Sequence, residues 1–155
     1  LLTLQAALDL IDDLQAERRG EVLIVAAAGN SSDDHPHWPA AFDRVVAVGA
    51  LNQDETPADF STRGAWVDCS TVGVGIRSTY VEGEELPDLD APDPHETWGA
   101  NSWAQWLGTS FAAPQVAGAV AKLAHESGST LRLALQTLLR GRDRVHGFGR
   151  IRRIL

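Results

Sequence analysis

The feature that most constrains the fold is a short apolar run that directly follows an amphipathic segment. Residues 22–25 read Val-Leu-Ile-Val, a continuous run typical of a strand buried on both faces of a parallel sheet. Before it, residues 4–14 carry leucine and isoleucine at helical spacing, between Thr3 as the expected N-cap and Gly20 as the expected end. A helix followed at once by a buried strand predicts an α/β fold.

Further runs along the chain extend this pattern. Residues 45–51 repeat the apolar, β-branched composition, and residues 66–67 and 74–76 are shorter strand candidates. Residues 108–127 predict a buried helix, whose alanines and glycine would let neighbouring backbones approach closely. The leucines at 131, 135, 138 and 139 predict a final amphipathic helix that ends near Gly141. With 155 residues and 44% hydrophobic content, the chain has the size and composition of one domain.

An acidic, proline-rich segment interrupts the apolar pattern at about residues 82–104. Between residues 82 and 96 there are seven acidic residues and three prolines, which predicts a surface loop or insertion. Its carboxylates could hold a structural Ca²⁺, because calcium prefers oxygen ligands, although their spacing is not that of an EF-hand. We expect no other cofactor.

Charge and composition exclude several partners. The net charge of −8 argues against nucleic acid and anionic membranes as partners. The sequence has no run of 18 apolar residues, so we expect neither a membrane span nor a targeting segment. The basic residues 140–153 are expected to form a solvated tail. The single cysteine, Cys69, excludes an internal disulfide and is expected to be a small buried residue. The chain contains no methionine, so we expect it to be a piece of a longer protein.

Residues 108–114 carry the first pattern that points to chemistry. They read Gly-Thr-Ser-Phe-Ala-Ala-Pro, in which glycine permits a turn, Ser110 opens a helix, and proline is tolerated in the first turn. The positive end of the helix dipole favours an oxyanion beside Ser110. The simpler interpretation of this serine is an ordinary helix cap.

The second pattern follows the first predicted strand. Residues 26–30 read Ala-Ala-Ala-Gly-Asn, so small side chains would let an extended peptide lie close to the backbone. In open α/β sheets ligands bind at the carboxyl ends of strands, where the Asn30 amide could donate a hydrogen bond to an oxyanion. The alternative is an asparagine that serves only a turn.

Together these segments resemble the subtilisin-like serine proteases, the subtilase or peptidase S8 family. Residues 26–30 and 108–118 are similar to two hallmark motifs of that family, and residues 38–40, 45–50 and 147–149 resemble it in the same order. The resemblance implies a three-layer subtilisin-like fold, with a mainly parallel sheet flanked by helices. Only the C-terminal half of that single domain would be present in residues 1–155.

The resemblance also implies roles for individual residues. Ser110 would be the nucleophile that forms an acyl-enzyme, and Asn30 would stabilise the oxyanion. Pro39 would follow a cis peptide bond. Asp33 and Asp34 lie close by in the sequence and could favour basic side chains in the substrate; the alternative is that both are solvated loop residues. The expected substrate-binding residues are Ala27, Ala28, Gly29, Trp38, Pro39, Ala40 and Thr109, with His37 beside them.

The family's catalytic Asp and His motifs do not occur in these residues. The resemblance therefore implies a serine endopeptidase acting on polypeptides, outside the cell, whose Asp and His come from an N-terminal remainder of the same protein. The isolated chain is expected to be inactive. The alternative is a non-catalytic subtilisin-like domain that binds peptide or has a structural role. A small-molecule hydrolase would instead require a Gly-x-Ser-x-Gly elbow, which is absent around Ser110.

Overall fold

The computed structural model describes residues 1–18, 20–84 and 97–154. The chain begins with helix α1 (Leu2–Arg18) and then builds a five-stranded sheet in the order β1-β2-β3-β9-β8. The first four strands in that order are parallel, and β8 pairs antiparallel with β9. The strands are β1 (Ile24–Ala27), β2 (Val45–Leu51), β3 (Cys69–Val72), β8 (Arg144–Val145) and β9 (Gly149–Ile151).

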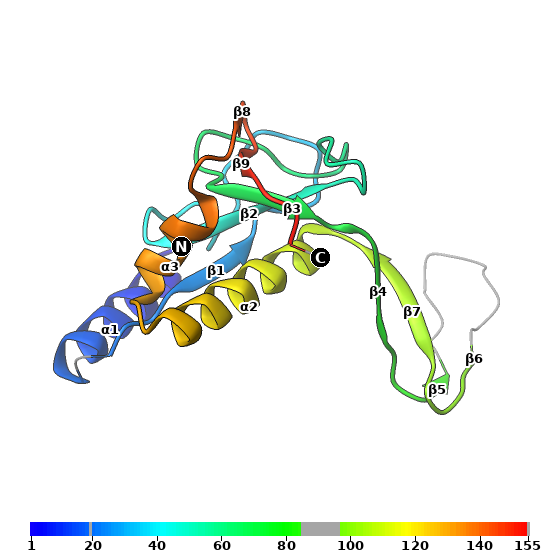
Figure 1. The fold of residues 1–155 in the computed structure, drawn as a ribbon, viewed down its shortest axis with the longest axis horizontal. Coiled ribbons are helices and arrows are strands. Elements are labelled where there is room, and N and C mark those ends of the chain that lie inside the picture. Colours follow the sequence, from blue (N-terminus) through cyan, green and yellow to red (C-terminus); the bar gives the residue numbers. More distant parts are fainter. Residues whose placement is uncertain (19, 85–96, 155) are drawn as a thin grey trace.

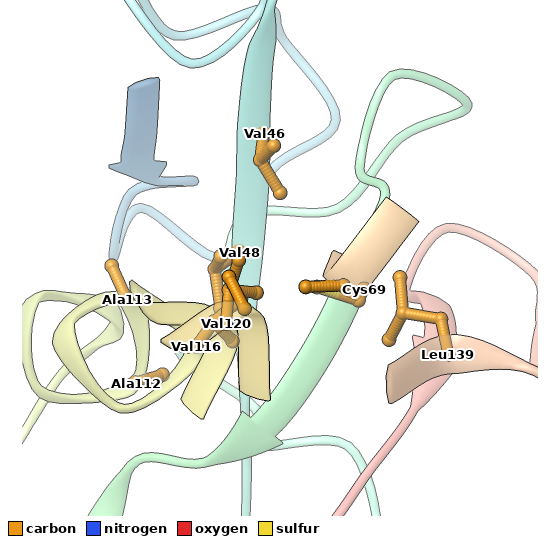
Figure 2. Packing of buried hydrophobic residues seen from close by; sticks show 10 residues of the cluster. Val46, Val48, Cys69, Ala112, Ala113, Val116, Val120 and Leu139 are labelled. Carbon is orange, nitrogen blue, oxygen red and sulfur yellow. The ribbon is translucent and has the colours of Figure 1, made fainter. Parts of the chain in front are cut away.

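Two helices cover one face of this sheet. Helix α2 (Thr109–Ser127) packs along β1, β2 and β3, and helix α3 (Leu131–Leu139) packs beside α2 (Figure 1). Figure 2 shows Val48, Val116 and Val120 gathered between β2 and α2, and each is at most 1% exposed. Burial of such side chains stabilises the fold by about 1.5–3 kcal/mol each. A mainly parallel sheet flanked by helices confirms the predicted fold class.

Strand β2, which lies between β1 and β3, is covered on both faces. All seven of its residues are buried, as expected for a continuously apolar strand in a parallel sheet. On the face away from α2, the chain after β2 folds back over the sheet. Ala58 N–H donates to the carbonyl of Ala50, and the Ser61 hydroxyl accepts from Ala50 N–H at 3.0 Å. This returning segment leads into β3.

Several element boundaries differ from the sequence prediction. Helix α1 begins at Leu2, so Thr3 lies inside it and is not its N-cap. Strand β1 begins at Ile24 and not at Val22. Residues 66–67 are not a strand, and the third parallel strand is instead β3, which the sequence prediction missed. Helix α2 agrees with the prediction to within one residue, and Gly108 is its N-cap.

The predicted loop at residues 82–104 is partly wrong, because its ends form strands. β4 (Val74–Thr79) pairs antiparallel with β7 (Trp103–Leu107), and β5 (Gly83–Glu84) pairs with β6 (Thr97–Trp98). Figure 1 shows β4 and β7 projecting away from the sheet as a two-stranded ribbon. The remaining residues, 85–96, lie outside the described part of the chain, and so does most of the predicted calcium site. Across residues 1–18, 20–84 and 97–154, no three or more His, Cys, Asp or Glu side chains are grouped to hold a metal.

The basic C-terminal segment is not a free tail. It forms the hairpin of β8 and β9, and Phe148 between them is only 5% exposed. Gly149 has a φ of 63°, and a side chain there would collide with the backbone of Asp68. Apolar residues and glycines among the arginines therefore let this segment join the sheet. No helix in the described ranges is both long and apolar enough to cross a membrane.

Candidate active site

Two glycines determine where α2 begins. The Gly108 N–H donates to the carbonyl of Gly73, directly after β3, at 2.8 Å. A side chain on Gly73 would come within 2.9 Å of the Gly108 carbonyl and 2.8 Å of the Ala50 Cβ. Gly108 itself has a φ of 145°, a conformation that other residues rarely adopt. This close approach holds the N-terminus of α2 against the end of β3.

Ser110 is the second residue of α2 and is exposed. At this position its backbone N–H has no acceptor within the helix, and the helix dipole is positive. Among the described residues its hydroxyl makes no hydrogen bond. The serine is therefore accessible, and its N–H is available to a bound anion.

The Asn30 side chain is held in one orientation by Thr109. Its Oδ1 accepts hydrogen bonds from the backbone N–H and from the hydroxyl of Thr109, both at 2.9 Å. Because Oδ1 is occupied in this way, the donor end of the amide lies on the other side. Asn30 Nδ2 is 3.4 Å from the point where a Cβ on Gly108 would lie. The Asn30 donor is thus fixed beside the turn that leads into Ser110.

Thr109 also holds the chain on the other side of Asn30. Its hydroxyl accepts from Gly29 N–H at 3.2 Å, and the residue is 1% exposed. Thr62 acts in parallel, since its N–H donates to the Gly29 carbonyl and its hydroxyl accepts from Ser31 N–H. The prediction placed Thr109 among the substrate-binding residues and missed this role. The signal that could have revealed this role is a hydroxyl residue next to the candidate nucleophile, Ser110.

The residues after Asn30 fold back against Gly29. Gly29 has a φ of 114°, and a Cβ on it would lie 2.9 Å from both His37 Nδ1 and Thr62 Oγ1. The peptide bond between Trp38 and Pro39 is cis, as predicted. Trp38 is 43% exposed, and its ring centroid is 4.3 Å from that of Phe42. Residues 35–40 are therefore brought to the carboxyl end of β1.

The other predicted substrate-binding residues differ in their exposure. Ala27 is half-buried at the end of β1, whereas Ala28 and Ala40 are at most 1% exposed. Ala28 and Ala40 are thus buried as whole residues, main chain included, and the substrate-binding roles stay predictions. Asp33 lies beside a histidine, with its Oδ1 3.5 Å from His37 Nε2.

None of the described histidines lies in contact with Ser110. His35 and His37 approach the acidic side chains of Asp33 and Asp34 instead. His125 is 15 residues further along α2, a separation of about 22 Å in a straight helix. His146 lies between β8 and β9. The described residues therefore contain the serine and the candidate oxyanion donor, Asn30, but no base bonded to the serine.

Cys69 is not accessible as a nucleophile. It is 1% exposed in β3, and burial, with a smaller effect of the neighbouring Asp68, raises the pKa of its thiol to about 12. Since the thiolate is the reactive form, this cysteine is inert at neutral pH. The expectation of a small buried residue is confirmed.

The geometry is suited to acyl transfer. A serine at a helix N-terminus, beside a fixed amide donor at the carboxyl end of a parallel strand, can stabilise an oxyanion on an α/β fold. A family model described as "Subtilase family" matches residues 3–141, and the chain belongs to this family.

Characterised relatives agree with this assignment. The chain is 34% identical over 134 residues to a thermophilic serine proteinase of Bacillus sp. (strain AK1), covering 86% of the chain and 28% of that protein. It is 34% identical over 136 residues to thermitase of Thermoactinomyces vulgaris, covering 86% of the chain and 41% of thermitase. The chain thus spans less than half the length of either relative.

Solved structures show the same fold. A lanthipeptide protease superposes with a TM-score of 0.65 at 20% identity, covering 86% of this chain and 48% of that one. The prenylagaramide maturation protease PagA superposes with a TM-score of 0.63 at 25% identity, and the match covers 88% of this chain and 46% of PagA.

Proposed function

We propose that this chain is the serine-bearing part of a serine endopeptidase that cleaves polypeptides through an acyl-enzyme on Ser110. The observation that carries the proposal is the pair of hydrogen bonds from Thr109 to Asn30 Oδ1. They leave the Asn30 amide donor beside the N-terminus of α2, where it would act together with Ser110 N–H. Preorganised donors of this kind stabilise the charge that develops on the carbonyl oxygen.

In the proposed reaction, Ser110 Oγ attacks the carbonyl carbon of the scissile bond and its proton passes to a histidine. The carbonyl oxygen becomes an oxyanion that accepts from Asn30 Nδ2 and Ser110 N–H. The C–N bond then breaks as the histidine returns the proton to the leaving amine. Water hydrolyses the resulting ester by the same route and releases Ser110.

The histidine and its aspartate partner would come from residues that precede Leu1 in the same protein. The exposure of β1 supports this part of the proposal. β1 ends the order of strands in the described sheet, and all four of its residues are only half-buried, whereas β2 is fully buried. A strand edge of this kind can pair with further chain. Action outside the cell is proposed on the family resemblance alone.

Labelling with a fluorophosphonate tests the proposal in the full-length protein. Label is expected on Ser110, and Ser110→Ala should abolish both labelling and peptide hydrolysis. Residues 1–155 alone should label slowly or not at all, because no base is bonded to the serine in the described residues. Labelling that survives Ser110→Ala would contradict the proposed nucleophile.

The second candidate is a non-catalytic domain that binds peptide or has a structural role. The described residues contain no hydrogen bond to Ser110 Oγ, which fits this candidate as well as the first. A full-length protein that binds peptide but neither labels nor hydrolyses it would decide for this candidate.

A further inference from the structure

Four aromatic side chains form a continuous row along the ribbon toward the nucleophile. The ring centroids of Trp98 and Tyr80 are 4.5 Å apart, those of Tyr80 and Trp106 are 5.7 Å apart, and those of Trp106 and Phe111 are 5.9 Å apart. Phe111 directly follows Ser110 in the chain. We call these four residues the aromatic row. It runs from the far strands of the ribbon to the residue beside the nucleophile.

The aromatic row is not part of the protein core. The core cluster lies between the sheet and helices α2 and α3 and includes none of these four residues. Trp106 is 39% exposed, and Tyr80, Trp98 and Phe111 are each only partly buried. The ribbon consists of two two-stranded sheets, β4 with β7 and β5 with β6. Within the described residues, no second layer packs against it. Apolar surface left open in this way marks an interaction site.

The position of the row defines which part of a substrate it would meet. Both ribbon strands join the body at the N-terminus of α2, where Gly108 N–H bonds to Gly73. Figure 1 shows the ribbon projecting from this end of α2, away from β1. The residues expected to bind the acyl part of the substrate lie at the end of β1, around Asn30. The ribbon therefore extends from Ser110 on the opposite side, toward the leaving group.

We propose that the aromatic row binds the polypeptide substrate on the C-terminal side of the scissile bond and takes apolar or aromatic side chains there. This proposal rests on the proposed function of Ser110. Aromatic rings offer large apolar faces, and stacking on them adds about 0.5–1.5 kcal/mol to the area buried. The row thus extends substrate recognition over several residues beyond the bond that is cut.

The far end of the row adds a charge preference. Trp98 pairs with Gly83, and the flanking Glu82 and Glu84 are exposed. A substrate segment that follows the row reaches this acidic end last. We therefore expect aromatic residues close to the cleaved bond, followed by lysine or arginine.

Two substrates with the same acyl part separate this proposal from the proposed function. The first is a short peptide anilide that ends at the scissile bond, and the second is extended beyond that bond by Phe-Tyr-Lys-Lys. In the full-length protein, Tyr80→Ala and Trp98→Ala should lower kcat/KM for the extended peptide about tenfold, mainly through KM. Turnover of the anilide and fluorophosphonate labelling should remain unchanged.

Trp103→Ala is the matched control. Trp103 lies on the same strand as Trp106, three residues away and so on the opposite face, and it is 61% exposed. This variant should cleave both substrates as the unaltered protein does. Tyr80→Phe keeps the ring and should also retain the activity on the extended peptide.

Three results would overturn the proposal. The first is an equal loss of kcat/KM on both substrates in Tyr80→Ala and Trp98→Ala. The second is an unchanged kcat/KM for the extended peptide in these two variants. The third is the same loss of kcat/KM in Trp103→Ala. A dimer of the full-length protein that Tyr80→Ala dissociates would also overturn it, because the row would then bind a second copy.

If neither anilide turnover nor labelling occurs, the proposed function fails. The affinity of Ser110→Ala protein for the extended peptide, measured by fluorescence, then tests whether the aromatic row binds peptide. An affinity that Tyr80→Ala leaves unchanged contradicts this proposal.

Discussion

Replacing Thr109 by valine tests how the side chain of Asn30, the proposed oxyanion donor, is held. Valine has nearly the same shape as threonine but lacks the hydroxyl that donates to Asn30 Oδ1 and accepts from Gly29 N–H. The backbone hydrogen bond from residue 109 to Asn30 is retained. The Asn30 amide would therefore lose one of its two fixed contacts, and Gly29 N–H would lose its acceptor in a buried position.

The expected magnitudes follow from these contacts. One hydrogen bond has a net value of about 0.5–1.5 kcal/mol, so kcat should fall about two- to tenfold as the amide becomes less well oriented. The unpaired Gly29 N–H should lower the free energy of unfolding by about 1–3 kcal/mol. Complete removal of the donor by Asn30→Ala should cost more, about 10²–10³ in kcat, which is the value known from a subtilisin.

The assay is steady-state hydrolysis of a peptide anilide by the full-length protein, together with urea unfolding. Thr109→Ser keeps the hydroxyl and should retain both kcat and stability, which makes it the control. A Thr109→Val protein with unchanged kcat but reduced stability would refute the reasoning, because the hydroxyl would then serve the fold and not the orientation of Asn30.

Three further predictions concern the surroundings of the site. Gly29→Ala, where φ is 114° and a Cβ would meet His37 and Thr62 at 2.9 Å, should lower the free energy of unfolding by about 1–3 kcal/mol in urea; unchanged stability would contradict the reported contacts. Burial raises the pKa of Asp68 above its ordinary value of 3.8, so ionisation of this carboxyl destabilises the fold as the pH rises above 3.8. Asp68→Asn should match the unaltered protein in urea at pH 3 and exceed its stability at pH 7; the opposite order would refute this. Cys69, whose thiol pKa is raised to about 12, should react with iodoacetamide only after unfolding, and rapid reaction of the folded protein at pH 8 would show that the thiol is accessible.

The sequence predicted best those elements whose local pattern and burial agree. Strand β2 is apolar throughout and buried throughout, and α2 and α3 carry apolar or small residues at helical spacing, several of which are buried. Strand β3 was missed because Ser70 and Thr71 look like loop residues. Both are buried, and the Ser70 hydroxyl donates to the Phe148 carbonyl, 78 residues away. A partner so distant leaves no local signal.

The candidate site shows the same division. The sequence motifs pointed to both Asn30 and Ser110 as candidates. The structure adds that Thr109, the residue before Ser110, is hydrogen-bonded to the Asn30 side chain. The aromatic row could not be predicted, because Tyr80, Trp98 and Trp106 lie in segments that look like loop from composition alone. Their alignment depends on the pairing of β4 with β7 and of β5 with β6, which is set by tertiary contacts.

The central claim is that Ser110 forms a covalent acyl-enzyme, and acid-quenched mass spectrometry measures this directly. The full-length protein is mixed with an activated ester substrate, quenched within milliseconds and digested. The account predicts an acyl adduct on the peptide that contains Ser110, which Ser110→Ala abolishes. Substrate turnover without an adduct, or with the adduct on another residue, would contradict it.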